Sequence, residues 1–124
     1  MKLFLDKECT VEEVKKIFTT YYPYLRLELY KKPVDKIDFT THKERSFLKK
    51  FTHSFGKIVI DINNDITVAE LENQFASVGL LSEVFRKSGN VWVETSLTNN
   101  WTLHQQNAEG EEISRHFNIK KVDS

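Results

Sequence analysis

Two stretches of the chain carry apolar residues at the spacing of an amphipathic helix, and both begin with the same capping signature. Thr10 and Thr67 are each followed three positions later by a Glu, the capping box in which each side chain accepts a hydrogen bond from the other residue's backbone amide. Pro23 and Gly79 predict where the two helices end. The apolar positions between these signals predict one buried stripe on each helix: Val11, Val14, Ile17, Phe18 and Tyr21 on the first, and Val68, Leu71, Phe75 and Val78 on the second.

Each predicted helix lies between two apolar stretches of strand length. Residues 2–6 and 57–62 precede the helices, and residues 24–30 and 81–88 follow them. Leu alternates with charged residues over 25–29, which is the period of a half-buried strand. The pattern therefore predicts two strand–helix–strand units offset by 57 residues, either because of a duplication or because both obey the same local rules.

A third helix is predicted in the basic connection between the units, residues 31–56. Thr41 and Glu44 repeat the capping pattern there, and apolar residues follow at helical spacing. We expect this helix over residues 42–54.

The segment after the second predicted helix has the pattern of a β-hairpin. Apolar residues of strand type, Val84-Phe85 and Val91-Trp92-Val93, lie on the two sides of Gly89, whose tolerance of positive φ suits a tight turn. With Ser88 and Gly89 as the loop, Phe85 lies opposite Trp92 in the predicted register.

Together these elements predict one domain over residues 1–124 of the α+β class. We expect a two-layer α/β sandwich with one mixed, largely antiparallel sheet and the helices on one of its faces. The first β-α-β unit covers residues 1–30, and the second, with the C-terminal hairpin, covers residues 57–106. Trp101–Leu103 is the last predicted strand, and residues 107–124 are predicted to be a polar tail.

Composition and charge narrow the classes of protein that fit. The 124 residues are 40% apolar, which is enough for one packed core, and 18 basic side chains balance 18 acidic ones. Bulk charge therefore indicates neither nucleic acid nor an anionic membrane as a partner. The apolar runs are strand-sized, the N-terminal residues lack the features of a secretory signal, and the lone Cys9 leaves no internal disulfide. We expect a cytoplasmic protein without a membrane span.

Local charge is less even than the total. Residues 31–57 hold eight Lys or Arg against three Asp or Glu, whereas residues 61–112 hold two against nine. This asymmetry predicts solvated faces of opposite sign.

The segment Asp61–Glu72 places oxygen ligands as a calcium loop of the EF-hand type does, but Ile66 stands where the tight turn needs Gly. The competing interpretation gives the segment a purely structural role: Asp61 ends a strand, residues 63–65 form a turn, and Thr67 caps the next helix. We favour the second interpretation and expect no metal and no cofactor. Cys9 is interpreted as a small hydrophobe before a helix, and the four histidines lack the spacing of metal ligands.

Five residues around the hairpin are the candidates for ligand or partner binding: Phe85, Arg86, Lys87, Trp92 and Trp101. Cations, a flexible turn and aromatic rings together suit a phosphate or nucleic-acid contact, and large aromatic side chains also dominate protein interfaces. An ordinary hairpin tip has the same composition, and we expect both cations to be exposed there.

The predicted hairpin has apolar residues on both of its faces. The predicted helices cover one of these faces. The other presents Phe85 and Trp92 together, which predicts a homodimer through this face. Alternatively, Ile113 and Phe117 of the tail fold back over the same patch and complete the monomer.

The stretch from Phe85 to Thr95, followed by Asn100–Leu103 and by Gln106 and Asn107, resembles a family of short uncharacterised bacterial proteins. The resemblance runs over most of the chain and implies a bacterial cytoplasmic domain, without an activity or a ligand. No catalytic signature is recognisable in the sequence. We therefore expect a non-catalytic binding or interaction module, with a nucleic-acid or phosphate-ligand binder as the alternative and a small enzyme as the third possibility.

Overall fold

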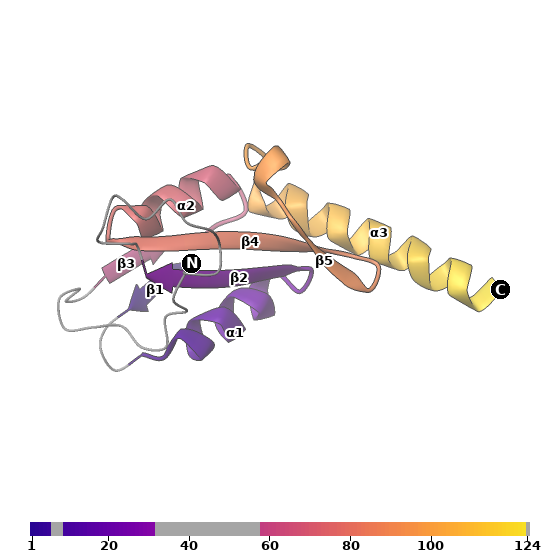
Figure 1. Ribbon diagram of the computed structural model, residues 1–124, viewed down its shortest axis with the longest axis horizontal. Coiled ribbons are helices and arrows are strands. Elements are labelled where there is room, and N and C mark those ends of the chain that lie inside the picture. Colours follow the sequence, from indigo (N-terminus) through magenta and orange to yellow (C-terminus); the bar gives the residue numbers. More distant parts are fainter. Residues whose placement is uncertain (6–8, 32–57, 124) are drawn as a thin grey trace.

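The computed structural model describes residues 1–5, 9–31 and 58–123, and the predicted helix over 42–54 lies outside them. Figure 1 shows the described elements, which are, in chain order, β1 (Lys2–Leu5), α1 (Val11–Tyr21), β2 (Leu25–Lys31), β3 (Ile58–Asp61), α2 (Val68–Ala76), β4 (Leu80–Ser88), β5 (Val91–Glu94), the 3-10 helix η3 (Ser96–Thr98) and α3 (Leu103–Asp123).

The α+β class is confirmed, but the described strands form two antiparallel sheets instead of one mixed sheet. One sheet pairs β1 with β3, and the other has the order β2-β4-β5. The two strands of each strand–helix–strand unit therefore belong to different sheets. Each strand pairs with the equivalent strand of the other unit, which no pattern within one unit predicts.

The pairing of the two units has a local two-fold symmetry. Leu3 lies opposite Ile60 in the first sheet, and Leu27 lies opposite Val84 in the second. In both pairs the residues are 57 positions apart, the same offset that separates the two capping threonines. Antiparallel pairing of equivalent residues is what a two-fold axis produces, so both pairs have the register expected of two units related in this way. This relation supports a duplication as their origin.

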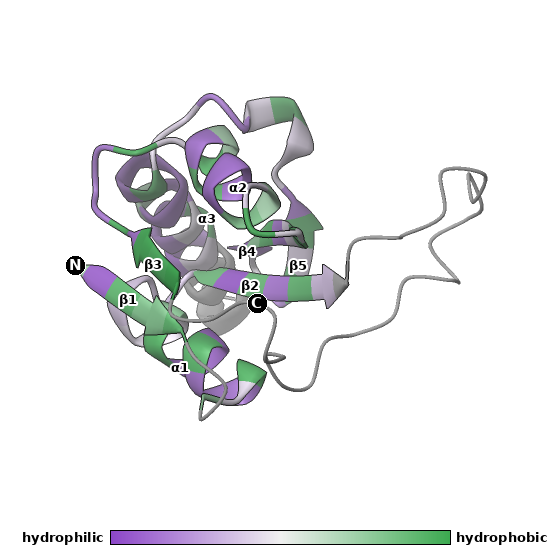
Figure 2. Cartoon of the chain, turned by 90° about the vertical axis from the view of Figure 1, so that its left-hand side faces the viewer, coloured by the Kyte–Doolittle hydropathy of each residue, from purple (hydrophilic) through white to green (hydrophobic). Residues whose placement is uncertain are grey.

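The core lies between the two sheets. Figure 2 shows the sheets on opposite sides of it, with α1 and α2 closing it from below and above. The Thr67 capping box is confirmed: Thr67 Oγ1 accepts from the Glu70 amide at 3.0 Å, and Glu70 accepts from the Thr67 amide at 3.4 Å. The stripe predicted for α1 is partly wrong, because Ile17 and Tyr21 are exposed. The buried helix residues of the core are Val11, Val14 and Phe18 from α1, and Val68, Leu71 and Phe75 from α2.

The C-terminal region differs most from the prediction, because a 21-residue helix replaces the last strand and the polar tail. Thr102 and Gln105 cap this helix α3 through reciprocal amide bonds of 2.8 and 3.1 Å. The side chains buried along it are Leu103, Gln106 and Ser114, together with Gly110. Hydrophobic periodicity fails here because small and polar residues occupy the buried positions. The C-terminal end of α3 extends beyond the hairpin (Figure 1).

The hairpin forms as predicted, but its register is shifted by two residues. Gly89, at φ 69°, and Asn90 form the loop, so Lys87 lies opposite Trp92 and Phe85 opposite Glu94. Because side chains alternate with a period of two, this shift leaves Phe85 and Trp92 on the same face. Among the described helices, none has the length and apolar character required to cross a membrane.

Candidate functional site

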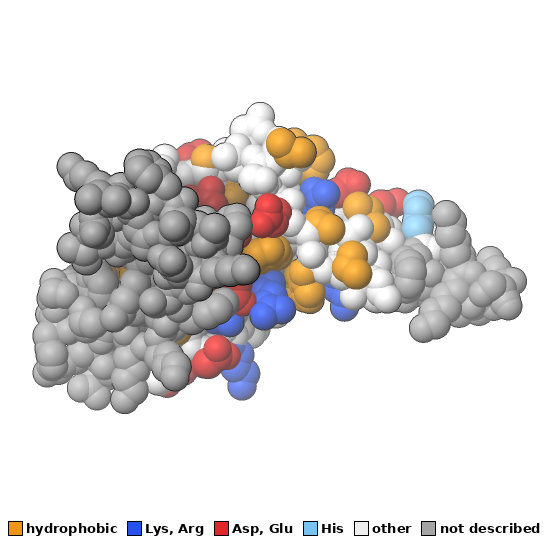
Figure 3. Space-filling view, in the orientation of Figure 1, with side chains coloured by type: hydrophobic (Ala, Val, Ile, Leu, Met, Phe, Trp, Pro, Cys, Tyr) orange, Lys and Arg blue, Asp and Glu red, His pale blue; other side chains and the backbone are white. Residues whose placement is uncertain are grey.

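The three-stranded sheet has an inner face, which packs on the core, and an outer face. Alternation along β2 turns Leu25, Leu27 and Leu29 inward and places Arg26 and Glu28 outward. The described helices bury their apolar stripes against the inner face. Figure 3 shows hydrophobic side chains over β4 and β5 with basic and acidic side chains around them.

Two hollows on this side of the sheet share lining residues, and together we call them the outer groove. The first, of about 280 Å³, is lined by Arg26, Glu28, Tyr30, Phe85 and Trp92. The second, of about 550 Å³, shares Arg26 and Trp92 with the first and continues along α1, where its wall is formed by Glu12, Glu13, Lys15, Lys16 and Thr19.

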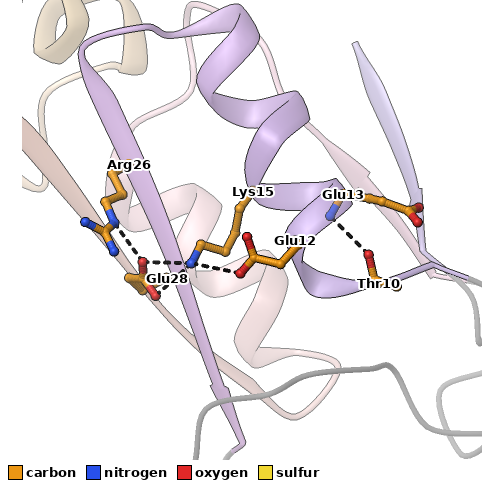
Figure 4. A network of polar contacts seen from close by, with 6 residues as sticks. All are labelled: Thr10, Glu12, Glu13, Lys15, Arg26 and Glu28. Carbon is orange, nitrogen blue, oxygen red and sulfur yellow. Dashed lines mark hydrogen bonds and ion pairs between the residues drawn. The ribbon is translucent and has the colours of Figure 1, made fainter.

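A buried carboxylate holds two cations at the bottom of the outer groove (Figure 4). Glu28 is 7% exposed, and its Oε1 accepts a hydrogen bond from Arg26 Nε at 2.9 Å. Lys15 Nζ lies 3.0 Å from Glu28 Oε1 and 3.2 Å from Oε2, and also 3.5 Å from Glu12 Oε1. A buried charge is stable when it is paired and hydrogen-bonded, and both conditions are met. Lys15 and Arg26 are therefore compensated by the protein's own carboxylates.

The aromatic side of the outer groove comes from the hairpin. Trp92 is 37% exposed, and Lys87 Nζ lies 5.8 Å from the centre of its ring, within the range of a cation–π contact. Phe85 is half-buried beside it, and Tyr30 is buried. This contact restrains an exposed indole before any ligand arrives.

Arg86 lies on the inner face and contacts Trp101 of the loop before α3, so the five candidates of the hairpin do not form one site. Arg86 Cζ lies 5.6 Å from the Trp101 ring, and Arg86 Nη1 donates to Gln106 Oε1 at 2.9 Å. Gln106 is fully buried, and its Nε2 donates to the Thr98 carbonyl at 2.7 Å. The expectation that Arg86 is exposed at the hairpin tip is wrong, because the side chain points under α3. Arg86 and Trp101 attach α3 to the hairpin.

A third hollow, of about 300 Å³, collects three carboxylates from different elements: Glu72 of α2, Glu83 of β4 and Glu94 of β5. Burial, and secondarily the charge of Glu83, raises the pKa of Glu72. These carboxylates are not placed to bind one ion, since no group of three or more His, Cys, Asp or Glu in the described part of the chain could hold a metal.

The Asp61–Glu72 segment has the local structure of the favoured interpretation. Asp61 ends β3, Asn63 Oδ1 accepts from the Asp65 amide at 2.9 Å in the turn, and Thr67 caps α2. Cys9 is partly buried against the core, and its Sγ lies 3.6 Å from the Phe4 carbonyl oxygen. His42 and His53 lie outside the described residues.

Of the sequence candidates, Phe85 and Trp92 line the outer groove and Lys87 contacts Trp92. Lys15, Arg26, Glu28 and Tyr30 also line the groove and were not among the candidates. The charged residues of β2 had the alternation of an ordinary half-exposed strand, and nothing local indicated that Glu28 is buried. Comparison with protein-family models, curated proteins and solved structures finds no significant match to this chain.

Proposed function

We propose that the protein is a non-catalytic binding module that takes a short segment of a partner protein in its outer groove. The observation that carries the proposal is the exposed Trp92 beside Phe85, in a groove where Lys15 and Arg26 are already paired with Glu28. An apolar or aromatic side chain of the partner packs against Trp92. The exposed part of the Arg26 guanidinium orients a partner carbonyl or carboxylate next to it.

The charge arrangement favours a protein segment over a nucleic acid, the alternative. Phosphate binding needs cations that can release counterions, whereas Lys15 and Arg26 already share the Glu28 carboxylate. Glu12 and Glu13 also line the same wall and would repel a phosphate. Perturbed pKa values in a groove would favour acid–base chemistry there. Among the described residues, Tyr22 and Glu72 have clearly shifted pKa values, and neither lines the outer groove.

A displayed library of random peptides, selected on the immobilised protein, tests the proposal. The chain has two tryptophans, so a Trp101→Phe variant makes Trp92 the single fluorescent reporter of the groove. We expect selected peptides to shift Trp92 emission. Trp92→Ala should weaken their binding by at least about tenfold, the effect of losing roughly 1.4 kcal/mol.

Val59→Ala is the matched control, because Val59 is more exposed than Trp92 and lies in the other sheet. Peptides that bind the Trp92→Ala variant as tightly as the parent would exclude the groove as their site. Random oligonucleotides that bind at least as well, with an affinity that falls steeply with salt, would favour the nucleic-acid alternative.

A further inference from the structure

Among the described strands, β5 is an edge strand of its sheet. No strand in the described part of the chain lies beyond β5 in the β2-β4-β5 order. Val91 is 53% exposed and Trp92 37%, and Leu97, just after the strand, is 97% exposed. Open edges with exposed apolar side chains add strands from other chains, unless Pro or charged residues block them. Glu94 is the sole charged residue of β5.

The hairpin geometry decides which backbone groups face this edge. In a hairpin with a two-residue loop, the residues next to the loop exchange both hydrogen bonds, here Ser88 and Val91. Hydrogen-bonded and open pairs then alternate, so Arg86 and Val93 form the next hydrogen-bonded pair. The backbone amides and carbonyls of Trp92 and Glu94 consequently point away from β4, toward the open edge.

We propose that β5 pairs with β5 of a second copy, antiparallel, about a two-fold axis at Trp92. Trp92 then exchanges both backbone hydrogen bonds with the partner's Trp92. Val91 lies opposite the partner's Val93 on the inner face, and cross-strand pairs of β-branched residues stabilise a sheet.

The segment Val91-Trp92-Val93 reads the same in both directions, so each of its residues meets an identical residue type across the two-fold axis. Glu94 lies opposite the partner's Asn90, so the two-fold brings no like charges together. The dimer extends each three-stranded sheet to six strands and places the partner's Trp92 beside the outer groove. It uses the strand edge, whereas the dimer expected from the sequence used the sheet face.

Disulfide trapping tests the register. Residues directly opposite in a hydrogen-bonded antiparallel pair have Cα atoms about 5.5 Å apart, which a disulfide can span. In a Cys9→Ser background, we expect Trp92→Cys to form a covalent dimer under mild oxidation. Tyr21→Cys is the matched control, because Tyr21 is 58% exposed but lies on α1. Equal cross-linking of both variants would indicate random collisions and overturn the proposal.

Charge variants at the axis give an independent test. The parent should sediment with an average mass approaching twice that of the chain at a concentration on the order of 100 µM, because small interfaces bind weakly. Trp92→Lys and Trp92→Glu should each be monomeric alone, since the two-fold opposes like charges, and should form a mixed dimer when combined. A monomeric parent, or variants that dimerise alone as the parent does, would overturn the proposal. Thermal melts monitored by circular dichroism verify that each variant is folded.

The outcomes for the dimer and for the proposed function are separable. A monomeric parent that still binds selected peptides through Trp92 overturns the dimer alone. A dimeric parent that selects no peptide overturns the groove function alone.

Discussion

Replacing Gly110 of α3 by Ala tests how closely this helix packs on the hairpin. A Cβ at this position would lie 2.9 Å from Tyr24 Cβ, 3.1 Å from Arg86 Cγ and 3.2 Å from the Lys87 carbonyl oxygen. The distance to Tyr24 Cβ is shorter than real Cβ contacts in proteins, so Tyr24 or the backbone of α3 must shift in the variant. The Lys87 oxygen belongs to the backbone, and Tyr24 Cβ is bonded directly to the Cα of its own residue. Neither atom can therefore move away by a rotamer change.

Two effects of opposite sign compete in Gly110→Ala. Ala is the better helix former by about 1 kcal/mol, which would stabilise the variant. Overpacking of a filled interior costs about 1–3 kcal/mol, and two rigid neighbours place this site in the upper part of that range. We expect a net loss of about 1–2 kcal/mol, which corresponds to a fall in Tm of roughly 4–8 °C for a chain of this size.

Urea denaturation followed by circular dichroism measures the loss. Ala108→Gly is the control in the same helix, because Ala108 is exposed and its replacement changes helix propensity alone, at a cost of about 1 kcal/mol. If Gly110→Ala instead stabilises the protein by the amount that Ala108→Gly destabilises it, propensity decides the outcome and the close contact does not exist.

Three further predictions concern other sites. Arg86→Ala should cost about 1–3 kcal/mol because it removes a partner of a buried hydrogen-bond network, whereas Lys87→Ala should cost less than about 0.5 kcal/mol; equal effects in urea melts would contradict the assignment of Arg86 to the inner face. Thr67→Ala should lose about 1 kcal/mol of stability with or without calcium, and a melting shift that depends on calcium would contradict a purely structural cap. Because burial and the nearby Glu83 raise the pKa of Glu72, its ionisation opposes folding, and stability from this group falls as pH rises through its folded pKa. Glu72→Gln should therefore stabilise the protein around pH 7 and lose this advantage around pH 3, and a constant difference across melts at both pH values would refute the shift.

Polar side chains between Phe85 and Asn107 hold the C-terminal region against the rest of the fold. Gln106 accepts from Arg86, Asn107 Oδ1 accepts from the Tyr24 amide at 2.9 Å, and Thr95 Oγ1 donates to the Val84 carbonyl at 2.7 Å. These bonds connect β5, η3 and α3 to the rest of the sheet. These polar residues therefore stabilise the fold, whereas Phe85 and Trp92 of the same segment line the outer groove.

Local signals in the sequence were sufficient for the elements that depend on neighbouring residues. The Thr67 capping box, the alternation along β2 and the positive φ of Gly89 each involve contacts within a few residues, so the pattern and the structure agree. The 57-residue offset between the units was visible in the sequence, but the pairing of each strand with the equivalent strand of the other unit was not.

Tertiary structure alone decided which strands pair and which polar residues are buried. The pairing of β1 with β3 joins residues about 57 positions apart, and no periodicity within either strand specifies its partner. Helix α3 was missed because Gln106 and Gly110 face the hairpin, where hydrogen bonds and close approach replace apolar burial. Arg86 and Glu28 had the pattern of surface charges, and each is stabilised below the surface by partners that are distant in the chain: Gln106 for Arg86, and Lys15 for Glu28.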